Sequence, residues 1–461
     1  MKPRYFIQTF GCQMNAHDSE RMAGMLDNLG YDATPTAASA DVIVLNTCAV
    51  RERPEHKLYS ELGSLRKLKA DNPDLVIGVA GCMAQREADN IRRRVPEVDI
   101  LLGPRNLHHL PHLLRQASDG AAHADGLDLD CDPTPVTPVR RGNTVSAYVD
   151  VIFGCNFNCT YCAVPSARGR EVSRRPSEVL DEVRQLSDLG YREVTLLGQT
   201  VNAYGHDLER LPDGQRVDFA WLLEQINGIN SKLRVRFTSP HPMYFNARLI
   251  DVIASTACVC EHLHLPMQSG DNDCLRRMKR TYTIEKYRAI VDQMRAKIPG
   301  VAVTTDVITG FCGETDAEFD NTLRAFAEIE FDQAYMFAYS PRHTTVAWDW
   351  PDDVPAEIKQ RRLAQLIELQ NIIGREKNRR VVGQSYEVLV EGRSDKDATR
   401  LIGRTRTNKL MLFPGELEIY PPGSLVEVAA QEAFLWGFVG TATRVVSQPA
   451  APRAIIELKV A

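Results

Sequence analysis

Apolar and polar positions alternate in blocks along the first hundred residues. Four short apolar runs are each followed by a segment with the spacing of a helix. Runs of this length, apolar at nearly every position, are typical of parallel strands buried on both faces. The interval of about 35 residues between the first three runs suits successive βα units. The expected strands are at 5–7, 42–45, 75–77 and 98–102.

From residue 145 the alternation of strands and helices resumes on a larger scale. Helical spacing fills the gaps between strands, and Thr315 with Glu318 forms the pattern of a capping box at one helix start. Six βα units favour an open or partial barrel over a complete eight-fold one. The expected strands are at 147–153, 193–197, 233–237, 262–265, 301–308 and 333–337.

Beyond residue 384 the pattern changes to short strands separated by turns such as Pro414-Gly415, which indicates a small all-β barrel. The stretch 118–141 is rich in Asp, Ala and Pro and lacks periodicity, so we expect a linker there. The predicted fold is therefore α/β, with an N-terminal parallel-sheet domain, a central partial (β/α)6 barrel and a C-terminal β-barrel. The boundaries we expect are 1–117, 118–141 (linker), 142–380, 381–447 and 448–461 (tail).

Composition supports a multidomain globular protein. With 461 residues, the chain exceeds what one hydrophobic core normally supports. Apolar residues make up 44% and charged residues 25%, and no apolar stretch reaches the roughly 18 residues of a membrane span. The N-terminus has no signal-peptide layout, so we expect a cytoplasmic protein without membrane attachment. Because the net charge is −5, any nucleic-acid partner must be attracted by local basic patches.

Eleven cysteines are unusual for a cytosolic protein, where disulfides do not persist, and they are best interpreted first as ligands or nucleophiles. The sharpest signal is Cys155, Cys159 and Cys162, here called the loop trio, which directly follows a predicted strand. Three thiolates on one tight loop can hold three irons of a [4Fe–4S] cluster and leave the fourth iron open. The alternative, a structural zinc site, needs a fourth ligand, and no Cys or His lies close by in sequence.

A second group, Cys12, Cys48 and Cys82, is here called the N-terminal trio. Each of these cysteines follows the C-terminal end of a predicted parallel strand. Such ends form one edge of a sheet, so the three cysteines are expected to converge. Three buried cysteines acting as small hydrophobes would be the alternative, but that does not explain their placement at strand ends.

The Cys-x3-Cys-x2-Cys loop, with Tyr161 before its third cysteine, resembles the radical S-adenosylmethionine superfamily. With both trios present, residues 4 to about 445 resemble the methylthiotransferase family within it. The matching motifs are Thr9-Phe-Gly-Cys12-Gln-Met-Asn15, Asn46-Thr-Cys48-Ala-Val-Arg51-Glu52, Gly81-Cys82-Met-Ala-Gln, Arg168-Gly-Arg-Glu171, Leu197-Gly-Gln199-Thr-Val-Asn202 and His264-Leu-Pro-Met-Gln-Ser-Gly270.

The resemblance implies a transferase with two [4Fe–4S] clusters and S-adenosylmethionine. The cluster on the loop trio would yield the substrate radical, and the auxiliary cluster on the N-terminal trio would supply sulfur. No catalytic residue is expected beyond the six cluster ligands. Gly-Cys-Gln-Met-Asn at Cys12 resembles family members that act on tRNA, and their substrate is N6-isopentenyladenosine at position 37. The ribosomal-protein relative usually has Gly-Cys-Pro-Lys-Asn there.

Other interpretations remain open. The substrate could be a ribosomal protein or a differently modified adenosine 37, and the auxiliary cluster could relay electrons. From another class, the chain could be a non-catalytic iron–sulfur protein that binds RNA. The partners we expect are the anticodon stem-loop of tRNA and an electron donor such as a flavodoxin or ferredoxin, with the chain itself a monomer.

Further residues are assigned by position or resemblance. For the cofactor, the resemblance points to Tyr161, Gly198, Gln199 and Gln268. The C-terminal barrel resembles the TRAM domain, an RNA-binding module, and its expected RNA contacts are Arg393, Lys396, Arg404, Arg406 and Lys409. A group of arginines after the loop trio is interpreted as a solvated ion-pair patch or as contacts to tRNA phosphate or the cofactor carboxylate: Arg168, Arg170, Arg174 and Arg175.

Some cysteines and loops fit no family motif. Cys131, Cys274 and Cys312 are expected not to be ligands, and Cys258-Val-Cys260-Glu-His262 is an unsupported alternative metal site. The chain departs from the family at Cys312, where Pro is usual, and at Arg342-His-Thr-Thr, where Arg-Pro-Gly-Thr is usual. Both departures concern loop geometry and are expected to alter the pocket without removing a ligand.

Overall fold

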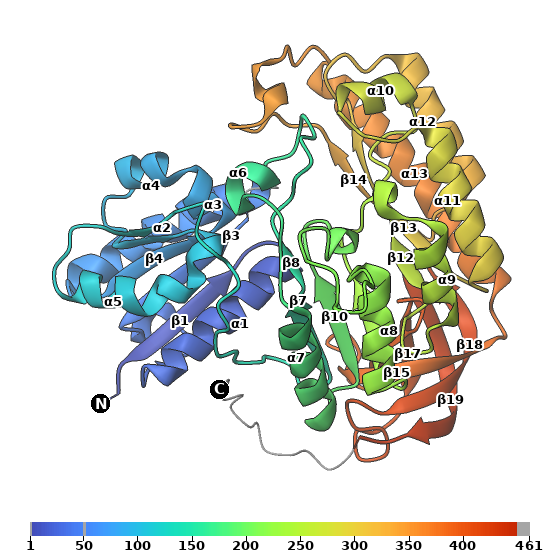
Figure 1. Ribbon diagram of the computed structural model, residues 1–461, viewed down its shortest axis with the longest axis horizontal. Coiled ribbons are helices and arrows are strands. Elements are labelled where there is room, and N and C mark those ends of the chain that lie inside the picture. Colours follow the sequence, from blue (N-terminus) through green and yellow to red (C-terminus); the bar gives the residue numbers. More distant parts are fainter. Residues whose placement is uncertain (1, 49–51, 450–461) are drawn as a thin grey trace.

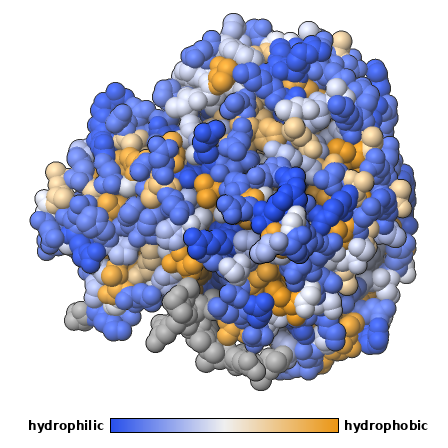
Figure 2. Space-filling view, viewed as in Figure 1, coloured by the Kyte–Doolittle hydropathy of each residue, from blue (hydrophilic) through white to orange (hydrophobic). Residues whose placement is uncertain are grey.

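The computed structural model describes residues 2–48 and 52–449, and Figure 1 shows three bodies along the chain. An α/β body forms from the N-terminal third, a larger α/β body from the centre, and a β-barrel from the C-terminal part. Figure 2 shows one face of the molecule, on which hydrophilic residues dominate and apolar ones are scattered, as on most folded proteins. Within the described ranges, no helix has the length and apolar character needed to span a bilayer.

The N-terminal body is a six-stranded sheet in the order β2-β1-β3-β4-β5-β6, and every neighbouring pair is parallel. Helices cover both faces, so β3 and β4 are buried at every position. This is why their sequences are continuous apolar runs and do not alternate. The elements are β1 (Arg4–Thr9), α1 (Gln13–Asn28), β2 (Asp32–Ala33), η1 (Ala37–Ser39), β3 (Val42–Thr47), α2 (Glu52–Asp71), β4 (Val76–Gly81), α3 (Cys82–Arg86), α4 (Ala88–Arg94), β5 (Ile100–Leu102), η2 (Pro104–His109), α5 (Leu110–Ser118) and β6 (Ala124–Gly126).

Strand β6 lies within the stretch expected to be a linker. Its three residues pair in parallel with β5 and complete the sheet edge. A three-residue strand carries too little periodicity to be recognised in a segment rich in Asp and Ala. The chain after Gly126 has no further strand until β7.

The central body has six parallel strands whose spatial order follows the chain. They form two three-stranded sheets, β7-β10-β11 and β12-β13-β14, which a parallel bridge between Val235 and Val259 connects. One hydrophobic core lies between the strands and the surrounding helices. The expected partial barrel is therefore confirmed, and so is the capping box, since Glu318 N donates to Thr315 Oγ1 and Thr315 N to Glu318 Oε2.

The elements of the central body, in chain order, are β7 (Ser146–Asp150), β8 (Ile152–Phe153), α6 (Val164–Arg168), β9 (Val172–Ser173), α7 (Pro176–Asp188), β10 (Glu193–Leu197), η3 (Val201–Ala203), α8 (Phe219–Ile229), β11 (Arg234–Phe237), η4 (Pro242–Tyr244), α9 (Ala247–Ser255), β12 (His262–His264), α10 (Asn272–Arg277), α11 (Ile284–Lys297), β13 (Ala302–Thr309), α12 (Asp316–Ile329), β14 (Gln333–Ala338), η5 (Val346–Asp349) and α13 (Ala356–Arg380).

The C-terminal body is a closed five-stranded barrel in the order β15-β16-β17-β19-β18 with its own apolar core. The sequence predicted this barrel from short strands at 386–391, 409–413, 424–429 and 436–442, and β16 lies outside these ranges. The strands are β15 (Ser385–Arg393), β16 (Arg400–Thr405), β17 (Leu410–Pro414), β18 (Leu425–Phe434) and β19 (Gly437–Ser447).

Buried arginines fix this barrel to the central body. Arg234 donates to the carbonyl of Arg404 (2.8 Å), and Arg236 donates to those of Thr405 (2.8 Å) and Arg406 (2.9 Å). Because β11 begins at Arg234, the barrel packs near the N-terminal ends of the central strands. Loops at the C-terminal ends of those strands are left for chemistry, as is usual in βα barrels.

Candidate iron–sulfur sites

The N-terminal trio gathers at the C-terminal edge of the N-terminal sheet. Cys12 precedes α1, Cys48 follows β3, and Cys82 is the first residue of α3. The side chains of Cys12 and Cys48 form a hydrogen bond, and Cys82 interacts electrostatically with Cys12. Cys12 is exposed, whereas Cys48 and Cys82 are buried. The parallel topology thus brings together three cysteines that are far apart in sequence.

A glycine before Cys82 is required by the backbone. Gly81 has a φ of 90°, in the region that L side chains rarely adopt. A Cβ atom there would lie 2.5 Å from the carbonyl oxygen of Thr47, closer than real contacts allow. The Gly-Cys pair of the motif therefore combines a sharp turn at the end of β4 with a ligand that begins the next helix.

Two buried asparagines hold the first turn of α1 against the end of β3. Asn15 Nδ2 donates to Asn46 Oδ1 (3.0 Å) and to the carbonyl of Thr47 (3.1 Å). Asn46 Nδ2 donates in return to the carbonyl of Asn15 (2.8 Å) and to Ser19 Oγ (2.9 Å). These bonds fix Cys12 relative to Cys48 and explain why both motifs contain asparagine. The rest of the Cys48 motif, Ala49 to Arg51, lies outside the described residues.

The electrostatics of the N-terminal trio favour a thiolate. The hydrogen bond from Cys48 lowers the pKa of Cys12 to about 5, with a further contribution from the positive charge of Arg168. Arg168 also interacts with Cys82, although burial raises the pKa of that thiol. Thiolates are the form of cysteine that binds metal, so the trio suits a cationic iron centre.

The loop trio begins at Cys155, two residues after the end of β8. Cys155 Sγ lies 3.2 Å from Thr200 Oγ1, and Cys159 Sγ accepts a hydrogen bond from Arg280 Nη1 (3.3 Å). The backbone turns back on itself at the end of the loop, where Cys162 N donates to the carbonyl of Cys159 (3.0 Å). Burial and the neighbouring thiols raise the pKa of Cys162 to about 12, so a bound cation is needed to keep all three sulfurs ionised together.

Neither trio is spaced for a single metal ion. A tetrahedral zinc ion with Zn–S bonds of about 2.3 Å would bring its sulfurs to about 3.8 Å from one another. Among the described residues, the ligand atoms of one group of three meet within 4.8 Å, and that group contains neither trio. Three thiols whose sulfurs do not all meet within this limit fit a cluster better than a mononuclear centre.

Aromatic stacking and backbone bonds hold the loop trio in place. The ring of Phe157 stacks on that of His241, with centroids 3.9 Å apart and planes inclined by 14°. Thr160 Oγ1 donates to the carbonyl of Arg277 (2.9 Å), and Thr160 N donates to that of Met278 (3.2 Å). Thr160, the residue after Cys159, is thus bonded to the C-terminal end of α10.

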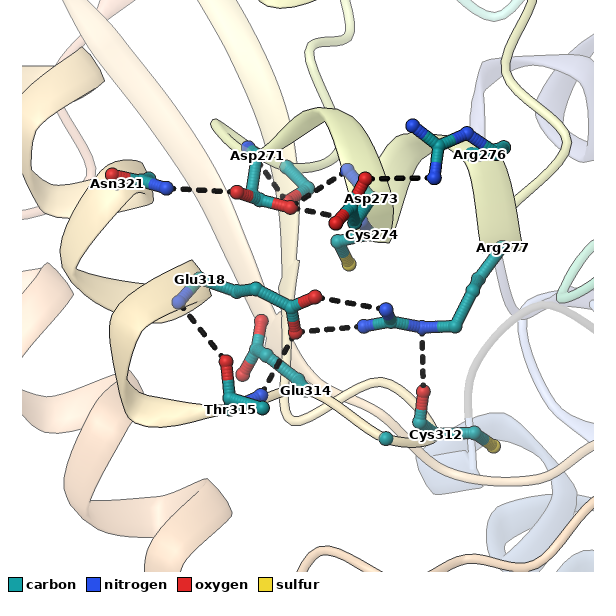
Figure 3. Close-up of polar contacts among 12 residues, drawn as sticks. Asp271, Asp273, Cys274, Arg276, Arg277, Cys312, Glu314, Thr315, Glu318 and Asn321 are labelled. Carbon is teal, nitrogen blue, oxygen red and sulfur yellow. Dashed lines mark hydrogen bonds and ion pairs between the residues drawn. The ribbon is translucent and has the colours of Figure 1, made fainter.

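Figure 3 shows how that end of α10 is itself anchored. Arg277 and Glu318 point toward each other and form two hydrogen bonds of 2.8 Å, while Arg277 Nε donates to the carbonyl of Cys312 (3.1 Å). At the start of the helix, the side chain of Asp271 accepts from the backbone of Asp273 and Cys274. Helix α10 is therefore clamped between the loop trio and α12.

The four residues assigned to the cofactor lie around the loop trio or at strand ends. Gln199 Oε1 accepts from the backbone of Gly154, just before Cys155, while its Nε2 is buried and has no partner among the described residues. Gly198 lies against β8, where a Cβ would come 2.5 Å from Ile152 Cγ2. Tyr161 packs edge-on against Phe311. Gln268 has a φ of 70° and bonds through its backbone to β13.

The arginines after the loop trio divide into two kinds. Arg168 and Arg174 are buried and form ion pairs with Asp18 (2.7 Å) and Glu182 (2.7 Å). Neither is part of a solvated patch, so that interpretation was wrong for both, and neither is free to contact tRNA phosphate. Arg170 and Arg175 are exposed. The Arg168–Asp18 pair joins α6, which follows the loop trio, to α1, which follows Cys12.

Two of the basic residues expected to contact RNA are occupied within the protein. Arg406 pairs with Glu261 (2.8 Å), and Lys409 pairs with Asp332 (3.0 Å), so both help to fix the barrel to the central body. Their charges are neutralised at an internal contact and are unsuited to bind phosphate. Of the other three, Arg393 pairs with Glu416 and Arg404 with Glu391, whereas no ion pair is recorded for Lys396 among the described residues.

The departure at residues 342–345 has a visible consequence. Thr344 has a φ of 71°, which suits the glycine usual in the family and is rare for a β-branched residue. Its Oγ1 accepts from Arg86 Nε (3.0 Å) and lies 2.9 Å from Ser166 Oγ. The loop therefore joins the end of α3, which begins at Cys82, to α6.

Sequence reasoning missed the two side chains that contact sulfur in the loop trio. Arg280 lies 121 positions after Cys159, and Thr200 belongs to the Leu197-Gly-Gln motif, although it was not chosen. The run of basic residues before Arg280 was a usable signal, since a buried cation beside thiolates is electrostatically favourable.

Comparisons with known proteins agree with this arrangement. Family models match at residues 4–103 ("Uncharacterized protein family UPF0004"), 149–326 ("Radical SAM superfamily") and 379–434 ("TRAM domain"). Among solved structures, the chain is similar in fold to a radical S-adenosylmethionine methyltransferase, TsrM from Kitasatospora setae. The TM-score is 0.55 at 14% identity, over 76% of this chain and 77% of the other.

Two relatives are similar over nearly their whole length. Both are named tRNA-2-methylthio-N(6)-dimethylallyladenosine synthase. The protein of Moorella thermoacetica is 47% identical over 93% of this chain and 96% of the relative. That of Carboxydothermus hydrogenoformans is 46% identical over 95% of this chain and 98% of the relative.

Proposed function

The chain belongs to the family of tRNA-2-methylthio-N(6)-dimethylallyladenosine synthases, and we propose that it adds a methylthio group to N6-isopentenyladenosine at position 37 of tRNA. It is a radical S-adenosylmethionine enzyme. The observation that carries the proposal is the presence of two three-thiol sites joined by one buried ion pair. Arg168, six residues after Cys162, pairs with Asp18, six residues after Cys12.

We assign one [4Fe–4S] cluster to each trio. Superfamily membership implies the cluster on Cys155, Cys159 and Cys162, and the second, on Cys12, Cys48 and Cys82, rests on the chemistry of the donor set. When bound, such a cluster with S-adenosylmethionine on its open iron supplies an adenosyl radical able to remove hydrogen from an aromatic carbon. Carbon 2 of adenine has no useful acidity, so acid–base side chains could not replace this reagent.

The residues of this chain have positioning roles in the proposal. Arg280 places a positive charge against Cys159 and offsets the negative charge of the thiolates. Gln199 fixes the turn before Cys155 and directs an unpartnered Nε2 group that is available to a ligand. The stacked ring of Phe157 and the edge-on packing of Tyr161 support the loop from neighbouring elements.

For tRNA, the proposal retains Arg393, Lys396 and Arg404 as contacts to the phosphate backbone. Among them, Lys396 has the most available charge. Lys396→Ala should therefore weaken tRNA binding. It should also reduce the slope of the logarithm of the binding constant against the logarithm of the salt concentration by about one, since each neutralised phosphate releases a counterion. Binding titrations at several salt concentrations measure this, and an unchanged slope would remove Lys396 from the interface.

The decisive experiment is an anaerobic assay of the reconstituted protein with dithionite, S-adenosylmethionine and tRNA that carries isopentenyladenosine at position 37. Mass spectrometry of the digested nucleosides should reveal the 2-methylthio derivative, and the same tRNA with unmodified adenosine should give none. Formation of 5′-deoxyadenosine without a modified nucleoside would contradict the assigned substrate. It would still support the proposed radical chemistry. A flavodoxin or ferredoxin is the proposed physiological replacement for dithionite, and the enzyme is proposed to act as a monomer.

A further inference from the structure

A third group of potential metal ligands lies away from both trios. His108 and His109 end η2, and Cys131 lies on the segment that follows β6. The sulfur of Cys131 is 3.7 Å from Nε2 of His108 and 3.6 Å from Nε2 of His109. Among the described residues, these three side chains form the one group of three or more whose ligand atoms all lie within 4.8 Å of one another.

The distances match those of a mononuclear site. A tetrahedral zinc ion, with Zn–S of about 2.3 Å and Zn–N of about 2.0 Å, separates the sulfur from each nitrogen by about 3.6 Å. One thiolate and two imidazoles are ligands that zinc accepts readily, and the same set suits iron–sulfur chemistry poorly. We propose that His108, His109 and Cys131 bind a zinc ion, separate from both iron–sulfur sites, which departs from the expectation from the sequence that Cys131 is not a ligand.

Three polar groups face the sulfur of Cys131. Besides the two Nε2 atoms, which lie at nearly equal distances, the carbonyl of Asp132 lies 3.7 Å from this sulfur and accepts from the thiol. The other ring nitrogen of His108, Nδ1, is buried and has no hydrogen-bond partner among the described residues. The polar interactions of that ring are therefore directed at Cys131.

The surroundings supply both signs of charge. Asp132 is the neighbour of Cys131 in sequence and interacts electrostatically with His108, and Asp128 interacts with Cys131. Arg105 supplies a positive charge, and its Nε donates to the carbonyl of Cys131 (3.0 Å). Three protein ligands leave one tetrahedral position, which water or the carboxylate of Asp132 would fill.

The position of the group indicates a structural role. Arg105 also donates to the carbonyls of Arg168 (3.1 Å) and Arg170 (3.0 Å), at the end of α6. A metal at Cys131 would therefore fasten the segment between the N-terminal and central bodies to η2, next to the arginine that holds α6. The ion would stabilise the interface between the two trios without taking part in their chemistry.

The test is metal analysis of the holoprotein. Protein produced with zinc in the medium, reconstituted with iron and sulfide and dialysed against a chelator, should contain about one zinc ion per chain besides its iron. Cys131→Ala and His109→Ala should each reduce zinc at least tenfold and leave the iron content unchanged. The unchanged iron shows that these variants still fold. X-ray absorption at the zinc edge should detect one sulfur and two nitrogen neighbours.

His112→Ala is the matched control. His112 is exposed in the first turn of α5, close to the group in sequence, and lies outside it. This variant should keep its zinc. The proposal is overturned if the wild-type protein holds less than a tenth of an equivalent, if Cys131→Ala retains zinc, or if His112→Ala loses it to the same extent.

Discussion

The N-terminal trio takes each cysteine from the end of a different parallel strand, whereas the loop trio takes all three from residues 155–162. In the first, the backbone sets the geometry through the register of β1, β3 and β4 and the turn at Gly81. In the loop trio, the loop itself has little regular structure, and its shape depends on side chains from neighbouring elements, among them Thr200, His241 and Arg280.

The difference teaches where each site is vulnerable. A trio distributed over a sheet fails when the sheet edge is disturbed, but its ligands cannot move independently of the fold. A trio on one loop is locally adjustable, and each supporting contact contributes separately. We therefore expect backbone changes to affect the N-terminal trio most and side-chain changes around the loop to act in graded steps.

The largest effects should come from the ligands themselves. Cys159→Ala should abolish both 5′-deoxyadenosine formation and methylthiolation, because the radical depends on the loop trio. Cys12→Ala should abolish methylthiolation and retain part of the 5′-deoxyadenosine formation. Both products are measured in the same anaerobic assay. Equal behaviour of the two variants would remove the distinction between the roles of the trios.

Two glycine substitutions should distinguish the backbone turn before Cys82 from the one before Cys155. Gly81→Ala places a Cβ where φ is 90° and the carbonyl of Thr47 is too close, so it should cost at least the roughly 1–2 kcal/mol of a left-handed residue. The protein should lose about half of its iron and keep 5′-deoxyadenosine formation. Gly154→Ala, at a φ of 73° and with a Cβ 2.6 Å from the carbonyl oxygen of Gly169, should disturb the loop trio instead. This variant should also lose about half of its iron, but it should lose 5′-deoxyadenosine formation as well.

Gly63→Ala is the control for both substitutions. It lies in α2 with no atom within 4 Å of an added Cβ and should stabilise the helix by up to about 1 kcal/mol. If Gly81→Ala and Gly154→Ala reduce iron and radical formation to the same extent, the two sites are not independently built.

Sequence alone identified the features that short-range pattern determines. The strands expected in both α/β bodies were recognised from local apolar patterns, and the cysteines from their positions after these strands. The structure has these strands where they were expected. Partners such as Asp18 and Arg168 are 150 positions apart, and their burial depends on how two bodies pack. A charged run is usually solvated, so no local signal distinguished Arg168 and Arg174 from the exposed Arg170 and Arg175.

The Arg168–Asp18 pair tests whether the two trios are coupled. Asp18→Asn leaves the guanidinium of Arg168 buried without its charge partner, and loss of one member of a buried pair costs about 3–5 kcal/mol. Anaerobic denaturation should reveal this loss, together with lower iron retention at both trios. Asp181→Asn, which breaks an exposed pair with Arg184, should cost less than about 1 kcal/mol. Similar effects of the two variants would indicate that the interface does not depend on the buried pair.

The most local effect should come from the clamp on α10. Glu318→Gln removes one charge from the bidentate pair with Arg277, and charge-assisted hydrogen bonds of this kind contribute about 1.5–3 kcal/mol. Because Arg277 also supplies the carbonyl that accepts from Thr160, the loop trio should lose iron to a chelator several times faster, whereas the N-terminal trio should not. Glu328→Gln, on the same helix, breaks a more exposed pair with Arg288 and should leave both rates unchanged. If iron is lost faster from both trios to the same extent, α12 supports the whole protein and not the loop in particular. The contrast between a site held by a sheet and a site held by side chains would then not apply to α10 and its contacts.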